Sequence, residues 1–266
     1  MPDVRVNGVR LYYEEHGNGD LILLIHGTSS SALIWGNAVA SLTSLGRVIV
    51  YDRRGCTRSE QPQPYEMTSV SEHADDAAGL LAAVGPTTSA IVIGRSYGGE
   101  IALDLASRYP ERVRALALLE PFVVGLDEDA DRWSNELNNR VRAAATEGIE
   151  RVGELFIREV LGMWNELPAE LQAMFTANGQ AILAECNGGD IEVDTATLAA
   201  IRHPTLLVTA SDSPEAFRRV IAAMAETMPN ARLLRVAGGH LVNPSDPGVL
   251  AFVREATLDQ HRRGHR

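Results

Sequence analysis

Residues 94–98 of this 266-residue chain read Gly-Arg-Ser-Tyr-Gly, between a strand-like apolar run at residues 89–93 and a helix-like stretch at residues 99–106. A serine between two glycines at such a strand-to-helix corner is the pattern of a nucleophile elbow. The corner is so tight that side chains at positions 94 and 98 would collide with the serine backbone, and glycine avoids the collision. The pattern therefore predicts a sharp turn that exposes the Ser96 hydroxyl at its tip.

The order of apolar runs along the chain predicts a parallel sheet. Residues 21–25 and 48–51 are almost continuously apolar, as in strands buried on both faces. Further strand-like runs alternate with segments of helical spacing, with strands at residues 9–15, 113–119, 205–209 and 232–236 and helices at 70–84, 97–109 and 248–261. This alternation is typical of an α/β fold, in which helices flank a mostly parallel central sheet.

The pattern changes between about residue 125 and residue 201. Three consecutive segments have helical spacing with no strand between them, at residues 127–147, 149–164 and 168–186. We therefore expect a helical cap, residues 126–201, inserted after the sixth strand of a core formed by residues 1–125 and 202–266. Bulky residues of the cap and of the nearby core are the expected walls of a substrate pocket: Trp35, Phe122, Trp133 and Trp164.

Ser96 needs a base, because a serine hydroxyl is a weak nucleophile until its proton is taken. His240 follows two glycines just after the last strand-like run, which places it on a loop at the same sheet edge as Ser96. The histidine in turn needs a carboxylate that holds its tautomer and stabilises the imidazolium. Asp212 and Glu120 both stand at strand ends. We favour Asp212 and keep Glu120 as the alternative acid.

The segment His26-Gly27-Thr28 follows the strand-like run at residues 21–25. Glycine at position 27 lets the backbone approach the site, so the Thr28 N–H can point at a developing oxyanion. The Tyr97 N–H, directly after the nucleophile, would be the second donor of this oxyanion hole. We expect His26 itself to brace the loop and not to take part in catalysis.

Together these segments resemble the α/β-hydrolase family, in particular its capped serine esterases and lactonases, and are similar also to cofactor-free haloperoxidase-like perhydrolases. The resemblance covers residues 2–125 and 203–258 and rests on His26-Gly27-Thr28 and on residues 52–59, 94–99, 109–113, 204–212 and 239–240. The family pattern after the fourth strand is Asp-x-Arg-Gly-x-Gly-x-Ser. Here Cys56-Thr57 replaces x-Gly, which leaves the shape of this loop open.

The resemblance also bears on the acid and on the reaction. Glu120-Pro121 is similar to the corresponding segment of lactone hydrolases in which the acid follows the sixth strand. Dehalogenases and epoxide hydrolases of this fold have Asp at the elbow, where this chain has Ser96. We therefore expect a serine hydrolase that cleaves carboxylic esters or lactones through an acyl-enzyme. The alternatives are a C–C bond hydrolase or lyase, a perhydrolase, and a non-enzymatic small-molecule binder.

The charge and composition of the chain limit the classes of partner, substrate and cofactor that we expect. The net charge of −11 argues against nucleic acid or an anionic membrane, and we expect a small neutral ester or lactone as substrate. No metal or organic cofactor is expected, because there is no HExxH, P-loop or dinucleotide fingerprint. Cys56 and Cys186 form no CxxC pattern and fit a reducing compartment. We expect a cytoplasmic monomer or homodimer without membrane spans.

Overall fold

The computed structural model describes residues 3–36 and 38–263, with side chains as far as residue 258. Its strands form one eight-stranded sheet in the order β1-β2-β4-β3-β5-β6-β7-β8. The strands are β1 (Asp3–Val6), β2 (Val9–His16), β3 (Leu21–Ile25), β4 (Arg47–Tyr51), β5 (Ala90–Arg95), β6 (Val113–Leu119), β7 (Thr205–Ala210) and β8 (Ala231–Val236). β2 runs antiparallel to β1 and β4, and the remaining neighbours are parallel. The mostly parallel sheet predicted from the sequence is confirmed.

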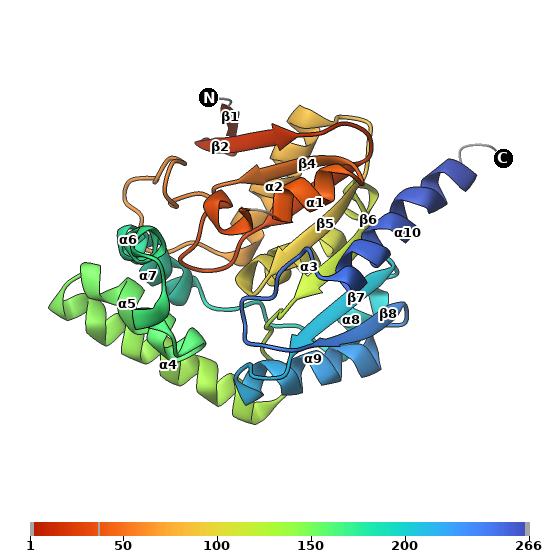
Figure 1. Ribbon diagram of the computed structural model, residues 1–266. Coiled ribbons are helices and arrows are strands. Elements are labelled where there is room, and N and C mark those ends of the chain that lie inside the picture. The colour runs from red at the N-terminus through yellow and green to blue at the C-terminus, as the bar shows by residue number, and fades with distance from the viewer. Residues whose placement is uncertain (1–2, 37, 264–266) are drawn as a thin grey trace.

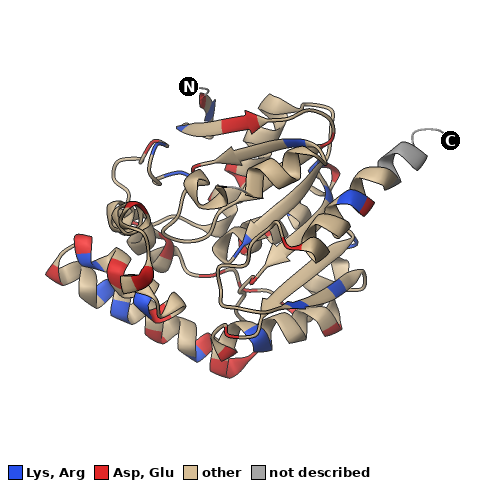
Figure 2. Ribbon diagram, viewed as in Figure 1, with Lys and Arg blue, Asp and Glu red and all other residues tan. Residues whose placement is uncertain are grey.

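Helices cover both faces of this sheet, because the central strands are apolar on both sides (Figure 1). The helices of the core are α1 (Ala38–Thr43), α2 (Val70–Val84), α3 (Tyr97–Arg108), α9 (Glu215–Thr227) and α10 (Pro247–Arg263), with short 3₁₀ turns η1 (Ala32–Trp35) and η2 (Pro110–Arg112). In β3, Leu23 and Ile25 belong to the same apolar cluster as α2, α3 and α9. Ile22 and Leu24 belong to the cluster that contains α1 and α10. Figure 2 shows the charged residues mainly on outer helices such as α4, α5 and α9, whereas the central strands carry few.

Between β6 and β7 the chain forms a helical insertion, as predicted. Its helices are α4 (Glu128–Glu147), α5 (Glu150–Leu161), η3 (Trp164–Glu166), α6 (Ala169–Ala177), α7 (Gly179–Gly188) and α8 (Thr195–Ala200). Figure 1 shows α4 to α7 gathered at one side of the sheet. The segment predicted as one helix at residues 168–186 is divided at Asn178, whose side chain bonds to the core. The limits 126 and 201 of the cap remain a prediction.

Parallel neighbours bring the chemically interesting residues to one edge. The strands β3, β5, β6, β7 and β8 lie next to one another in the sheet and are mutually parallel. Each is followed by one residue singled out in the sequence: His26, Ser96, Glu120, Asp212 and His240 respectively. Ligand sites of open parallel sheets lie at the carboxyl ends of their strands. The topology therefore collects these five residues where a site is expected.

The loop after β4 keeps its tight turn although it has Thr57 where the family pattern has glycine. Thr57 adopts φ 45°, a conformation that L-residues rarely take. Its N–H donates to the Asn178 side-chain oxygen at 2.9 Å, and the Asn178 amide donates to the carbonyls of Ser29 and Ser30 at 3.0 and 2.9 Å. Asn178 thus fastens the cap both to this loop and to the segment after His26.

Across the described part of the chain, no helix combines the length and apolar character that crossing a bilayer requires.

Candidate active site

Ser96 occupies a strained turn between β5 and α3. Its backbone has φ 54° and ψ −126°, and it precedes the first residue of α3. A Cβ on Gly94 would lie 2.2 Å from the Gly98 carbonyl oxygen, and one on Gly98 would lie 2.1 Å from the Ile25 carbonyl oxygen. Only glycine avoids these contacts, as the pentapeptide pattern predicts. Strain of this kind persists where the surrounding structure holds it, which is common at reactive residues.

His240 faces this turn, and its ring is oriented by Glu120. The His240 Nδ1 atom lies 3.2 Å from Glu120 Oε2, and both side chains are buried. The second carboxylate oxygen, Oε1, accepts a hydrogen bond from the Ala210 N–H at 2.6 Å, while the Ser213 hydroxyl donates to Oε2. With Nδ1 donating to Glu120, the Nε2 atom of His240 is free to accept a proton. Ser96 and His240 line one cavity and make no hydrogen bond to each other.

Asp212, the favoured acid of the sequence analysis, lies at the end of β7 but turns away from His240. Its side chain is exposed and accepts a hydrogen bond from the Ser211 hydroxyl at 2.8 Å. Only the Asp212 backbone contacts the histidine loop, through an N–H that donates to the Gly238 carbonyl at 2.9 Å. The geometry therefore brings the alternative acid Glu120, and not Asp212, against His240.

The carbonyl of the peptide between Gly27 and Thr28 is held by two hydrogen bonds. The Gly27 carbonyl accepts hydrogen bonds from Arg53 Nη2 at 3.0 Å and from the His26 ring at 2.9 Å. In a trans peptide the carbonyl and the N–H point in opposite directions, so the Thr28 N–H points away from Arg53. Thr28 lines a cavity together with Ser96, and Tyr97 is the first residue of α3, where an N–H has no acceptor within the helix. Both proposed oxyanion donors thus lie beside Ser96.

His26 is a brace, as expected from the sequence. The Arg53 N–H donates to its Nε2 at 3.0 Å, so the proton of the neutral ring is on Nδ1, which donates to the Gly27 carbonyl. Burial, with the nearby Arg53 charge, holds the pKa of His26 well below its ordinary value. A histidine that stays neutral and has both ring nitrogens occupied cannot serve as the base.

Arg53 links this loop to the cap through a buried ion pair. Its guanidinium lies 2.8 Å from Glu185 of α7, and both side chains are almost completely buried. Burial opposes the charge of Arg53, but the Glu185 carboxylate acts together with other nearby acidic groups, and their combined effect raises the pKa of Arg53. Because Arg53 also donates to the His26 carbonyl at 3.0 Å, one side chain fixes the cap and the proposed oxyanion loop together.

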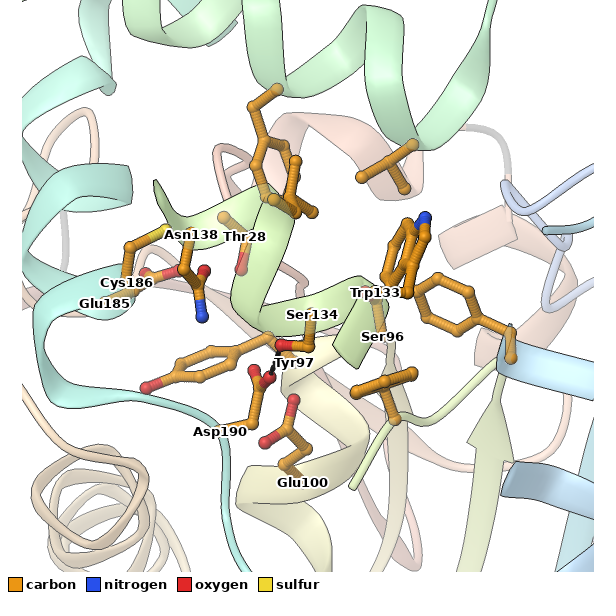
Figure 3. Close-up of a pocket in the computed structure, with 15 residues that line it drawn as sticks. Thr28, Ser96, Tyr97, Glu100, Trp133, Ser134, Asn138, Glu185, Cys186 and Asp190 are labelled. Atoms are coloured by element: carbon orange, nitrogen blue, oxygen red, sulfur yellow. Dashed lines mark hydrogen bonds between the residues drawn. The ribbon is translucent and has the colours of Figure 1, made fainter. Parts of the chain in front are cut away.

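Two cavities meet at Ser96 and Thr28. One, the His240 cavity, has about 380 Å³ of empty space, part of it open to solvent, and is lined by His240, Leu241 and residues of α5. The other, the Glu100 cavity, has about 490 Å³ of empty space, also partly open to solvent, and is shown in Figure 3. The expected wall residues Phe122 and Trp133 line the Glu100 cavity, where they meet at a ring-centroid distance of 5.8 Å.

The other two expected wall residues lie elsewhere. Trp35 is buried in the core, with the Arg95 guanidinium 4.6 Å from its ring centroid. Trp164 packs against the apolar cluster around Phe175 in the cap. Neither lines the His240 cavity or the Glu100 cavity. Large aromatic residues fill cores as readily as they line pockets, so size alone did not separate the two roles.

Three acidic residues of the Glu100 cavity were not singled out from the sequence. Glu100 comes from α3, Glu185 from α7, and Asp190 from the segment that follows α7. The available signal was Glu100, which with Asp104 is one of two charged residues in a stretch, 97–106, whose other residues are apolar or glycine. Burial and the neighbouring Asp190 raise the pKa of Glu100 well above its ordinary value.

An elbow serine with a histidine after β8, on a sheet of this topology, defines a protein of the α/β-hydrolase class. A family model described as "Alpha/beta hydrolase family" matches residues 22–251, and the chain therefore belongs to that family.

Known relatives and solved structures have several activities. The chain is 32% identical over 257 residues to the "Putative carbamate hydrolase RutD" of Azorhizobium caulinodans, covering 94% of this chain and 95% of the relative. It is 27% identical to a haloalkane dehalogenase of Sphingobium indicum, covering 94% of each chain. The structure of a thermophilic esterase from Thermogutta terrifontis matches with a TM-score of 0.75 and 25% identity over 100% of both chains. These comparisons show the family of the chain and leave the substrate of the chain open.

Proposed function

We propose that this α/β hydrolase cleaves carboxylic esters or lactones through an acyl-enzyme on Ser96. The observation that carries the proposal is the elbow residue itself: a strained serine, in one cavity with a histidine that is oriented by Glu120. A hydroxyl at this position supports acyl transfer, whereas relatives that open epoxides or displace halide use a carboxylate there. The similarity to an esterase structure is consistent with this choice.

Each step has a residue suited to it. Ser96 Oγ attacks the carbonyl carbon while His240 Nε2 takes its proton, and Glu120 stabilises the imidazolium that forms. The N–H groups of Thr28 and Tyr97 donate to the oxyanion. His240 then gives the proton to the departing alkoxide, and a water molecule activated by the same histidine releases the acyl group.

A panel of substrates for different nucleophiles tests this proposal. Purified protein is incubated with p-nitrophenyl esters of increasing chain length, a δ-lactone, 1-chlorohexane and styrene oxide. We expect acid release from at least one ester or lactone, with no halide and no diol. Halide or diol production without ester cleavage would contradict the proposal. Halide oxidation in the presence of peroxide would point to the perhydrolase alternative, and a β-diketone cleaved without any ester turnover to the C–C hydrolase.

A second prediction concerns Arg53 as a positioning residue for the Thr28 N–H. Arg53→Met leaves Glu185 buried without its cation, and we expect the free energy of unfolding to fall by about 3–5 kcal/mol. Arg53→Met combined with Glu185→Met removes both charges and is expected to recover most of that stability. The double variant should still have a kcat lower by up to about 10²-fold, because the Gly27 carbonyl loses its hydrogen bond from Arg53 and keeps only the one from the His26 ring.

Thermal unfolding and ester kinetics on the wild type, the single variant and the double variant separate the two effects. A stable double variant with wild-type kcat would show that Arg53 holds the cap to the core and does not position the oxyanion hole.

A further inference from the structure

Of the two cavities that meet at Ser96, one can hold the acyl group of a bound ester and the other its leaving group. His240 must give its proton to the departing alkoxide, so the leaving group belongs on the side of His240. His240 lines the His240 cavity and not the Glu100 cavity. If the proposed ester chemistry holds, the acyl group therefore extends into the Glu100 cavity.

The Glu100 cavity has two carboxyl groups without a cation. Glu185 is paired with Arg53, but neither Glu100 nor Asp190 forms an ion pair with any described residue. The Ile191 N–H donates to Glu100 Oε2 at 2.8 Å, and the Ser134 hydroxyl donates to Asp190 Oδ2. Within residues 3–36 and 38–258, no hydrogen bond reaches the second oxygen of either group. Figure 3 shows both carboxyl groups on one side of the cavity.

A second feature of this cavity also calls for a polar ligand. Tyr97 is 4% exposed, and its hydroxyl has no hydrogen-bond partner among the described side chains and backbone groups. In Figure 3 its ring extends along the cavity, with the hydroxyl at the end where Glu185 lies. A buried hydroxyl without a partner costs about 1–3 kcal/mol, which a ligand group or a water molecule would offset.

The remaining walls suit an organic cation on an apolar chain. Phe122, Trp133 and Phe217 line the cavity, with ring centroids 5.0–5.8 Å apart. Aromatic faces attract ammonium groups, most strongly where water is excluded. Glu100 lies four residues after Ser96 on α3, about 6 Å along the helix axis. A short linear chain can therefore connect a carbonyl at Ser96 with a cation at Glu100.

We propose that the Glu100 cavity selects acyl groups that carry a primary ammonium, bound between Glu100, Asp190 and the aromatic walls. This proposal rests on the proposed ester chemistry and replaces the neutral substrate expected from the sequence with a cationic one. Burial is the main cause that raises the pKa of Glu100 and of Asp190, and the Asp190 charge adds to the effect on Glu100. A bound ammonium would supply the missing counter-charge.

Matched esters test this selection. The amino substrates are the ethyl esters of 4-aminobutanoate, 5-aminopentanoate and 6-aminohexanoate. Their matched partners, in which methyl replaces ammonium, are the ethyl esters of pentanoate, hexanoate and heptanoate. The ethyl ester of 6-hydroxyhexanoate is a neutral polar control. At the best length, kcat/KM for the amino ester should exceed that of its methyl partner about tenfold or more, the scale of one desolvated charge pair. Glu100→Gln with Asp190→Asn should bring this ratio to about one. The control Glu192→Gln, at an exposed position, should keep the wild-type ratio.

A binding measurement makes the test independent of turnover. Butylammonium chloride should raise the Tm of the Ser96→Ala variant relative to equal sodium chloride, whereas butanol should not. The Tm rise should vanish when Glu100→Gln and Asp190→Asn are added. Ester hydrolysis without amino preference and without a Tm rise would overturn the inference and leave the proposed function standing. A Tm rise in a protein that cleaves no ester would support the cation site and reject the ester chemistry. A kcat/KM for ethyl 6-hydroxyhexanoate equal to that for ethyl 6-aminohexanoate would also overturn the inference, because the cavity would then select a polar group and not a cation.

Discussion

Replacing Ser96 with alanine is expected to lower kcat for a p-nitrophenyl ester by about 10⁶-fold, the scale seen when a serine nucleophile is removed. The Ser96 side chain makes no hydrogen bond to another described residue, and the strained φ of 54° would be shared by alanine. The Tm should therefore stay close to that of the wild type. Loss of activity in a folded protein would assign the effect to the hydroxyl itself.

The matched control is Ser107→Ala, at the exposed end of the same helix α3. It should retain the wild-type kcat within about twofold, as surface substitutions usually do. If Ser96→Ala kept a tenth or more of the wild-type kcat, the proposed acyl-enzyme would be excluded.

Glu120→Gln is expected to have the second largest effect, lowering kcat by about 10⁴-fold while Asp212→Asn leaves kcat within about threefold. Glutamine at position 120 can donate to His240 Nδ1 and so favour the tautomer that has its proton on Nε2. In that tautomer Nε2 cannot accept the proton of Ser96. Asp212 is exposed and bonded to Ser211, so its charge contributes nothing to the ring orientation.

The two variants are compared by ester kinetics after circular dichroism has shown that both fold. Because Glu120 is fully buried and accepts from Ala210 and Ser213, some loss of stability accompanies its substitution. The ratio of kcat between the two variants decides the assignment. A large loss in Asp212→Asn with a small one in Glu120→Gln would return the acid to the residue favoured from sequence.

The position of the elbow, the alternation of strands and helices along the chain and the helical insertion could be predicted because each leaves a local pattern. The glycines around Ser96 and the apolar runs follow from steric and burial requirements that act within a few residues. His240 could be placed for the same reason, as a residue that follows a strand. These predictions depend only on parallel strands that end at one edge of the sheet.

The acid could not be selected from sequence, because Glu120 and Asp212 follow β6 and β7, which are neighbours in the sheet. Both therefore stand near His240, and the choice depends on side-chain direction. Glu120 has φ 53°, its side chain is buried, and Ser213 supplies a donor. Neither a positive φ at a non-glycine residue nor a donor three positions after a strand leaves a reliable sequence pattern.

The chemistry of the Glu100 cavity was hidden for a different reason. Glu100, Glu185 and Asp190 come from α3, from α7 and from the segment after it, and only the packing of the cap on the core brings them together. Contacts between distant segments follow from the complete fold and not from local spacing. Tyr97 was singled out for its N–H and as a wall residue, but nothing in the sequence indicated that its buried hydroxyl has no partner among the described groups.

The most direct test of Ser96 as the nucleophile is peptide mapping after reaction with a fluorophosphonate, which phosphonylates activated serines. We expect one adduct on the peptide that contains Ser96, in a wild-type protein whose ester hydrolysis is lost in parallel with labelling. Ser96→Ala should give no adduct, and Glu120→Gln should react much more slowly than Asp212→Asn. No adduct on Ser96, or an adduct on another serine that accounts for the loss of activity, would contradict the proposed mechanism.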